Sequence, residues 1–201
     1  SCIISISTCN FAIMLKTENH FIQINATDRL HLMRFYENEN GTPVFLLHGA
    51  IENGHIFYSK NQKGLAPFLA ENGFDVYIGD LRGRGKSTPA ISRVSLYGQT
   101  EAINEDIPAF IEHIIKLRGN VPQFWFAHSW GGVLLSSYFA RYVQYRPLVK
   151  GMVYFATKRS IRVRNLHRYL MIDFMWNRFG FLLTKLYGYL PGKSWGYGSD
   201  N

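Results

Sequence analysis

The sequence predicts an α/β fold built on a largely parallel sheet, and three observations support this prediction. Short apolar runs alternate along the chain with segments of helical periodicity, which is the pattern of strand–helix repeats. Near the beginning, two strand-like segments joined by a turn predict an antiparallel hairpin. The chain has 201 residues, of which 47% are hydrophobic, so it is long enough to form one domain with a substantial core.

Strands are expected where residues alternate or run apolar, at 21–25, 30–35, 44–47, 74–79, 123–127 and 151–156. The first two form the hairpin. The run at 44–47 is continuously apolar, as in strands buried on both faces of a sheet, and 151–156 is also interpreted as a buried strand. Helices are expected at 65–72, 100–117 and 130–145, and the second is amphipathic, with its isoleucines on one face.

The region after the last expected strand is aromatic and basic. Its apolar residues at 161–190 recur at helical spacing, which fits either core-facing helices or helices that cover a pocket. It supplies much of the net charge of +8, through Lys158, Arg159, Arg162, Arg164, Arg168 and Arg178. We interpret this excess as a solvated face and expect no nucleic-acid binding, because no recognised binding motif accompanies it. The stretch 158–190 is where we expect contact with a membrane surface.

The ends of the chain carry little chemistry. Its two cysteines, Cys2 and Cys9, give no disulfide framework, no zinc-ligand pattern occurs, and we expect no metal or cofactor. Residues 1–13 lack the basic flank and cleavage site of a secretory signal. We therefore interpret Met14 as the natural start and expect a cytoplasmic protein. The expected organisation is a core at 14–157 and a lid or helical segment at 158–201, with 1–13 outside the domain.

The stretch 124–132 carries the clearest chemical signal. Apolar residues lead into His128 and Ser129 and then into small residues, which predicts a strand, a sharp turn and a helix. Ala127 and Gly131 flank Ser129 at two residues on either side, which is the spacing of a nucleophile elbow with Ala in place of its first Gly. The turn is so tight that large flanking side chains would collide with neighbouring elements. A structural turn with a helix-capping serine remains an alternative for this motif alone.

Two more polar stretches that contain glycine follow expected strands, at 48–50 and 80–87. In open α/β sheets, chemistry gathers at the carboxyl ends of the strands, so these stretches should meet near Ser129. For 80–87 we prefer a structural role, in which Gly83 and Gly85 permit the turn and Arg82 pins the loop by charge-assisted hydrogen bonds. The loop lacks the glycine spacing of a Walker phosphate-binding motif.

Together, these three stretches resemble the α/β-hydrolase superfamily. His48-Gly49, the loop 80–87 and the elbow 127–132 follow the third, fourth and fifth strands in the order found in that family, and the resemblance covers 21–156. It implies an α/β-hydrolase fold with a mostly parallel sheet, an N-terminal antiparallel hairpin and the start of a helical lid, incomplete at the C-terminus. The segment 65–87 is similar to acid lipases and monoglyceride lipases, which implies a lipid or fatty-acid ester as substrate.

The resemblance also implies roles for individual residues. Ser129 would be the nucleophile that forms an acyl-enzyme, and the backbone N–H groups of Ala50 and Trp130 would form the oxyanion hole. Each such donor stabilises the transition state by about 2.7–4 kcal/mol. His48 and His128 belong to the motifs, but neither is the catalytic base, and we expect them to pack and hydrogen-bond around the turns. Residues 158–190 occupy the place of the family's lid.

The acid and base of a triad are not present in this chain. The family order is serine, acid, histidine, whereas after Ser129 the only histidine, His167, precedes both Asp173 and Asp200. We therefore interpret the chain as the N-terminal part of a longer serine hydrolase and expect it to be inactive alone. The alternative is a non-catalytic binding protein of the same fold. Epoxide hydrolases and dehalogenases usually use an aspartate nucleophile, whereas peptidases and acyltransferases remain open.

Overall fold

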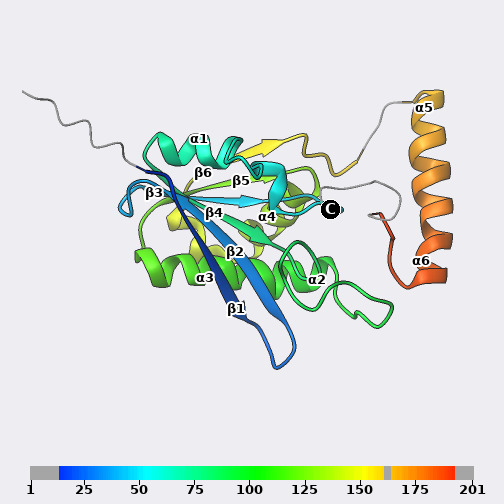
Figure 1. The fold of residues 1–201 in the computed structure, drawn as a ribbon. Coiled ribbons are helices and arrows are strands. Elements are labelled where there is room, and N and C mark those ends of the chain that lie inside the picture. The colour runs from blue at the N-terminus through cyan, green and yellow to red at the C-terminus, as the bar shows by residue number, and fades with distance from the viewer. Residues whose placement is uncertain (1–13, 161–163, 193–201) are drawn as a thin grey trace, which may run out of the picture.

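The computed structural model describes residues 14–160 and 164–192, and it confirms the predicted α/β fold. Its centre is a six-stranded sheet with the order β1-β2-β4-β3-β5-β6 (Figure 1). The strands are β1 (Lys16–Gln23), β2 (Arg29–Tyr36), β3 (Thr42–Leu47), β4 (Phe74–Asp80), β5 (Gln123–His128) and β6 (Val149–Phe155). The pairs β1–β2 and β2–β4 are antiparallel, and the other neighbouring pairs are parallel. The N-terminal hairpin therefore joins the edge of a parallel sheet, as expected.

Helices connect and cover these strands. The α-helices are α1 (Leu65–Glu71), α2 (Gln99–Glu101), α3 (Ile107–Arg118), α4 (Trp130–Arg141), α5 (Leu166–Arg168) and α6 (Phe181–Tyr187). Two 3₁₀ segments, η1 (Gly54–Phe57) and η3 (Val143–Leu148), and two π-helical segments, η2 (Ala102–Asp106) and η4 (Tyr169–Gly180), complete the set. Because α2, η2 and α3 follow one another directly, the predicted amphipathic helix at 100–117 is one continuous helical segment.

The sheet is buried on both faces. Phe45 and Leu47 of β3 pack with residues of α3 and α4 in one core cluster. Val44 and Leu46, which alternate with them, pack with residues of α1 in a second cluster on the opposite face. All four side chains are fully buried. This double burial explains why β3 is continuously apolar in sequence, and it holds the carboxyl ends of β3, β4 and β5 side by side.

Two strands differ from their predicted form. β1 begins at Lys16 rather than at 21, because Glu18 accepts hydrogen bonds from Arg34 (3.0 Å) and Tyr36 (2.5 Å) of β2 and so extends the ladder through polar residues. The prediction that β6 is buried is wrong. β6 is the last strand of the described sheet, and Val153, for example, is 37% exposed, because no described element covers its outer side.

The helical rod formed by α5, η4 and α6 stands beside the core rather than within it (Figure 1). Helical structure is therefore confirmed for part of the segment 158–201, whereas the predicted separation of residues 1–13 from the domain lies outside the described residues. None of the helices in the described ranges is long and apolar enough to cross a membrane.

Candidate active site

Ser129 occupies a strained turn between β5 and α4. Its backbone has φ 50° and ψ −122°, a conformation that residues other than glycine rarely adopt. Its N–H donates a hydrogen bond to the carbonyl oxygen of Phe155 at the end of β6 (2.8 Å), which anchors the turn to the neighbouring strand. This is the strand–turn–helix geometry that an elbow motif requires. It also places the serine at the N-terminus of α4, where backbone N–H groups favour negative charge.

Close packing explains the small residues after Ser129. A Cβ atom on Gly131 would lie 2.4 Å from the carbonyl oxygen of His48 and 2.8 Å from that of Leu47. A Cβ atom on Gly132 would lie 2.2 Å from Oγ1 of Thr157. The first turn of α4 thus packs directly against the end of β3 and against the segment that follows β6. A larger residue at Gly131 would push the elbow away from the end of β3, and one at Gly132 would push it away from the segment after β6.

His48 holds the loop after β3 in place. Its side chain is fully buried, Nδ1 lies 2.7 Å from the carbonyl oxygen of Gly49, and Nε2 accepts a hydrogen bond from the N–H of Leu81 (3.1 Å). Because the Leu81 N–H can only donate, the proton of the neutral ring sits on Nδ1. Burial lowers the pKa of His48 below its ordinary value, which favours this neutral form. The ring therefore joins the loops after β3 and β4, in line with the expected structural role.

Glu52, a carboxylate that the sequence analysis missed, links the loop after β3 to the turn after β5. Oε2 of Glu52 accepts a hydrogen bond from the N–H of Gly49 (2.8 Å) and lies 2.7 Å from Nδ1 of His128. Gly49 immediately precedes Ala50, and His128 immediately precedes Ser129. One carboxylate oxygen therefore ties the predicted oxyanion loop to the predicted nucleophile turn. No local pattern signals this contact, because Glu52 and His128 are 76 positions apart.

Asp80, at the end of β4, organises the third loop. Its carboxylate lies 2.7 Å from Nδ1 of His31 and accepts hydrogen bonds from the backbone N–H groups of Gly54 (2.7 Å) and Lys86 (3.1 Å). Burial alone would raise the pKa of Asp80, but the hydrogen bonds from His31 and from these backbone groups hold it below its ordinary value. Gly85 lies so close that a Cβ atom there would be 2.2 Å from Oδ2 of Asp80.

Arg82 has the structural role that the sequence suggests. Its guanidinium donates to Asp28 (3.1 Å), Glu105 (2.7 Å) and Asp106 (2.8 Å), and its backbone N–H donates to Asp106 (3.0 Å). These contacts fix the loop 80–87 against the turn before β2 and against η2. Within the described residues, no group of histidine, cysteine and acidic side chains has the arrangement of a metal site.

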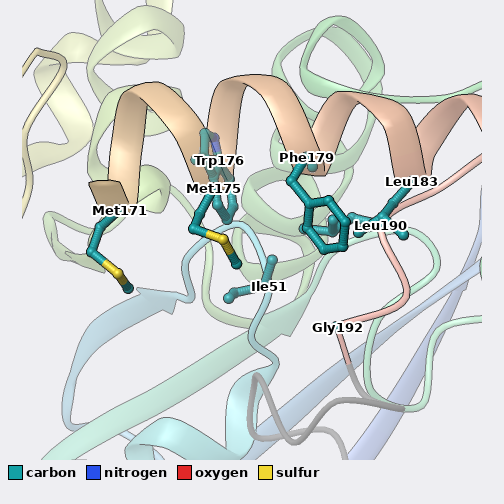
Figure 2. A pocket seen from close by; sticks show the side chains of 9 residues that line it. Ile51, Met171, Met175, Trp176, Phe179, Leu183, Leu190 and Gly192 are labelled. Carbon is teal, nitrogen blue, oxygen red and sulfur yellow. The ribbon is translucent and has the colours of Figure 1, made fainter. Parts of the chain in front are cut away.

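Two pockets flank the loop after β3. The first is apolar and lies between Ile51 and the α5–η4–α6 rod, which contributes Met171, Met175, Trp176, Phe179 and Leu183 (Figure 2). Figure 2 shows several of these side chains on the side of the rod that faces Ile51. The second pocket includes both Ala50 and Trp130 in its wall. The structure thus brings the two predicted oxyanion-hole residues to one pocket and places the next residue, Ile51, in the other.

The residues considered for the acid and base lie elsewhere. His167 is an exposed residue of α5, and Asp173 is in the same rod, 3.6 Å from Arg168. Asp200 lies outside the described residues. The described part of the chain therefore offers no partner from this set for Ser129.

Comparison with known proteins identifies the family. The family model described as the alpha/beta hydrolase fold matches residues 42–185, which is most of the chain. The chain belongs to the α/β-hydrolase family. The match begins at β3 and extends through the elbow into α6, so it includes all three loops described above.

Curated relatives and solved structures agree with this assignment. The chain is 30% identical to sterol esterase 2 of Saccharomyces cerevisiae over 96 residues (44% of this chain, 18% of that protein). It is 32% identical to lipase 1 of Drosophila melanogaster over 102 residues (46% and 23%). A haloalkane dehalogenase variant from Bradyrhizobium elkanii aligns with a TM-score of 0.59 at 20% identity, over 82% of this chain and 50% of that one, and shows the fold alone. The chain therefore spans half or less of each of these proteins.

Proposed function

We propose that this chain carries the nucleophile and oxyanion hole of a serine hydrolase that cleaves carboxylic esters. The observation that carries the proposal is the elbow: Ser129 has a strained positive φ at the start of α4, and the next residue, Trp130, shares a pocket wall with Ala50. Strain of this kind persists where the surrounding structure enforces it, and it clusters at functional sites. The similarity to an esterase and a lipase favours ester substrates.

In the proposed reaction, Oγ of Ser129 attacks the ester carbonyl carbon while a base removes its proton. The N–H groups of Ala50 and Trp130 donate to the oxyanion that develops on the carbonyl oxygen. Collapse of the tetrahedral intermediate breaks the bond to the alcohol, which leaves with the proton. Water then hydrolyses the acyl-enzyme by the same route and regenerates Ser129. We place the base and the acid that orients it outside residues 1–201, and we therefore propose that residues 1–201 alone have negligible activity.

The test compares three proteins on a series of p-nitrophenyl esters of increasing acyl length. We expect turnover by the natural protein that contains residues 1–201, and none above background by its Ser129→Ala variant or by residues 1–201 alone. Ser137→Ala serves as a matched control, because Ser137 lies in α4 and donates only to the carbonyl oxygen of Val133 (2.8 Å). Equal turnover by wild type and Ser129→Ala would refute the proposed nucleophile. Absence of turnover in the natural protein would favour the non-catalytic alternative.

We further propose that the α5–η4–α6 rod is a lid that shelters an apolar acyl chain. The pocket beneath it is lined by Ile51 and by apolar residues of the rod, which fits a hydrocarbon chain better than a charged group. Burial of a chain there would contribute about 0.8 kcal/mol for each CH₂ group. Trp176→Ala should therefore reduce the preference for longer acyl chains. An unchanged chain-length profile would contradict the lid assignment.

Exposed apolar side chains on the rod support the proposed contact with a membrane surface. They include Leu166 (73% exposed), Phe174 (55%) and Phe181 (68%), and Arg178 and Lys185 belong to the same rod. Apolar side chains beside basic ones suit an anionic lipid interface. We expect sedimentation with vesicles that contain phosphatidylserine and a large loss in a Phe174→Asp, Phe181→Asp variant. Equal sedimentation of both proteins would contradict this contact.

A further inference from the structure

Two methionines line the apolar pocket beneath the α5–η4–α6 rod. Met171 and Met175 lie four positions apart in η4, and Figure 2 shows their side chains on the side of the rod that faces Ile51. Each of the two residues is 44% exposed, so a small oxidant can reach it. A thioether is apolar and flexible, which suits a hydrocarbon pocket, but unlike an aliphatic side chain it can be oxidised. The pocket wall therefore contains two reactive sulfur atoms.

The other methionines belong to different parts of the structure. The chain has five in all. Met33 is buried in the core cluster beside α1, and Met152 of β6 is partly buried against the opposite cluster. Met14, which precedes β1, is 82% exposed. An oxidant should thus reach Met14, Met171 and Met175 first, and of these three only Met171 and Met175 line the pocket.

Oxidation would change the chemistry of the pocket wall. With hydrogen peroxide, a sulfur lone pair attacks one peroxide oxygen, so that an S–O bond forms as the O–O bond breaks. The departing hydroxide takes the proton of the transferred oxygen and leaves as water. Sulfur loses two electrons, the peroxide gains them, and the product is a polar sulfoxide. A polar atom placed against apolar walls such as Phe179 and Leu183 is unfavourable unless it is hydrogen-bonded.

We infer that Met171 and Met175 form an oxidation-sensitive wall of this pocket. Conversion of either residue to its sulfoxide by a peroxide weakens the binding of a hydrocarbon chain, and reduction of the sulfoxide restores it. For its effect on catalysis the inference rests on the proposed function, in which the bound chain is the acyl group of the ester. The modification leaves Ser129 and the proposed oxyanion donors intact, so the hydrolysis of short esters should continue.

Peptide mapping of the natural protein that contains this chain locates the oxidation. Trypsin should release Met171 and Met175 together in the peptide 169–178, separate from the peptides of the other three methionines. After a brief treatment with hydrogen peroxide, stopped by catalase, we expect oxygen to be added to 169–178 and to Met14 before Met33. Bound laurate should slow the oxidation of 169–178 and leave that of Met14 unchanged. Absence of protection by laurate would contradict the placement of the pair in a chain-binding wall.

The activity test compares kcat/KM for p-nitrophenyl decanoate with that for p-nitrophenyl butyrate, before and after peroxide. We expect the decanoate-to-butyrate ratio to fall about 5- to 20-fold, the lower part of the cost of an unpaired polar group, because the side chains are partly exposed. Methionine sulfoxide reductases A and B with dithiothreitol should restore the ratio, since they act on the two sulfoxide epimers and not on an oxidised Trp176.

A double variant, Met171→Leu with Met175→Leu, shows whether these two sulfur atoms cause the loss. Leucine has a similar volume but cannot be oxidised, so peroxide should leave the ratio of this variant unchanged. Each protein is compared with its own untreated sample, so the starting activity of the variant does not enter. Met14→Leu is the matched control and should respond as the wild type does. An unchanged wild-type ratio despite complete oxidation of 169–178, or a fall that persists in the double variant, would overturn the inference.

Calorimetric titration with laurate separates failure of the inference from failure of the proposed function. The oxidised wild type should bind laurate about 5- to 20-fold more weakly than the untreated protein, and the double variant should show no such change. If this weakening occurs but no ester is hydrolysed, the oxidation-sensitive wall stands and the proposed function fails. If esters are hydrolysed through Ser129 but oxidation changes neither laurate binding nor the ratio, the inference is overturned and the proposed function stands.

Discussion

Replacing Asp80 with asparagine should destabilise the fold strongly, because the Asp80 carboxylate contacts three hydrogen-bonding groups of the protein. These are Nδ1 of His31 and the backbone N–H groups of Gly54 and Lys86. Its side chain is 6% exposed and that of His31 is 1% exposed, so water cannot replace a lost partner. In the Asp80→Asn variant, the amide oxygen can still accept from Gly54, but the new NH₂ group would face the backbone N–H of Lys86, which can only donate, and the His31 ring would lose its charged partner. Loss of the charge-assisted hydrogen bond at His31 costs about 1.5–3 kcal/mol and the mispaired, partly exposed N–H of Lys86 adds less, so we expect a total loss of about 2–4 kcal/mol.

The free energy of unfolding in urea at pH 7 measures this loss for residues 1–201. Asp173→Asn is the matched control, because its pair with Arg168 has an N–O distance of 3.6 Å and both side chains are about a third exposed. Such a pair should change stability by less than about 1 kcal/mol. A loss below about 1 kcal/mol for Asp80→Asn, with an unchanged circular dichroism spectrum, would refute the assignment of Asp80 as the centre of the loop after β4.

Three other substitutions probe the elbow and its two neighbouring loops. Gly131→Ala should cost about 1–3 kcal/mol in urea unfolding, because its Cβ would overlap the backbone of β3, whereas Gly98→Ala, where the nearest atom is 4.0 Å away, should not show this loss. His48 binds a proton less readily when folded than when unfolded, so stability should fall as the pH drops below about 6.5. The free energy of unfolding should change by at most about 1.4 kcal/mol per pH unit. This pH dependence should disappear in His48→Gln, where the amide oxygen can accept from Leu81. A pH dependence that persists in this variant would implicate another titrating group. Glu52→Gln should lower kcat about 10-fold or more with little change in KM, as expected for misplaced oxyanion donors; a change in KM alone would assign Glu52 to substrate binding.

The fold was predictable because local patterns and burial agree along most of the chain. The continuous apolar run of β3 and the isoleucine face of the helix around α3 directly reflect the two buried faces of the sheet. The exposure of β6 was not predictable, because its apolar sequence is the same whether or not another element covers it. The early start of β1 was also missed, since it depends on Glu18 meeting Arg34 and Tyr36 across the hairpin.

In the candidate site too, local sequence patterns predict some features, whereas contacts between distant segments were missed. The elbow has a local signature, because a sharp turn requires small residues at fixed spacing around Ser129. The contacts that hold the elbow in place have no local signature, because they join segments that are distant in the sequence. Glu52 meets His128, and Asp80 meets His31, only once the sheet has formed. Glu52 has no local sequence signal, and although Asp80 opens the loop 80–87, nothing in the sequence points to His31 as its partner.

The assignment of Ser129 as nucleophile can be tested most directly by covalent trapping. The natural protein that contains residues 1–201 would be treated with a fluorophosphonate, digested and analysed by mass spectrometry. The account predicts one stoichiometric adduct on the peptide that contains Ser129, prevented by prior incubation with an ester substrate and absent from Ser129→Ala. An adduct on another serine, or hydrolysis of esters by a protein whose Ser129 remains unmodified, would contradict it.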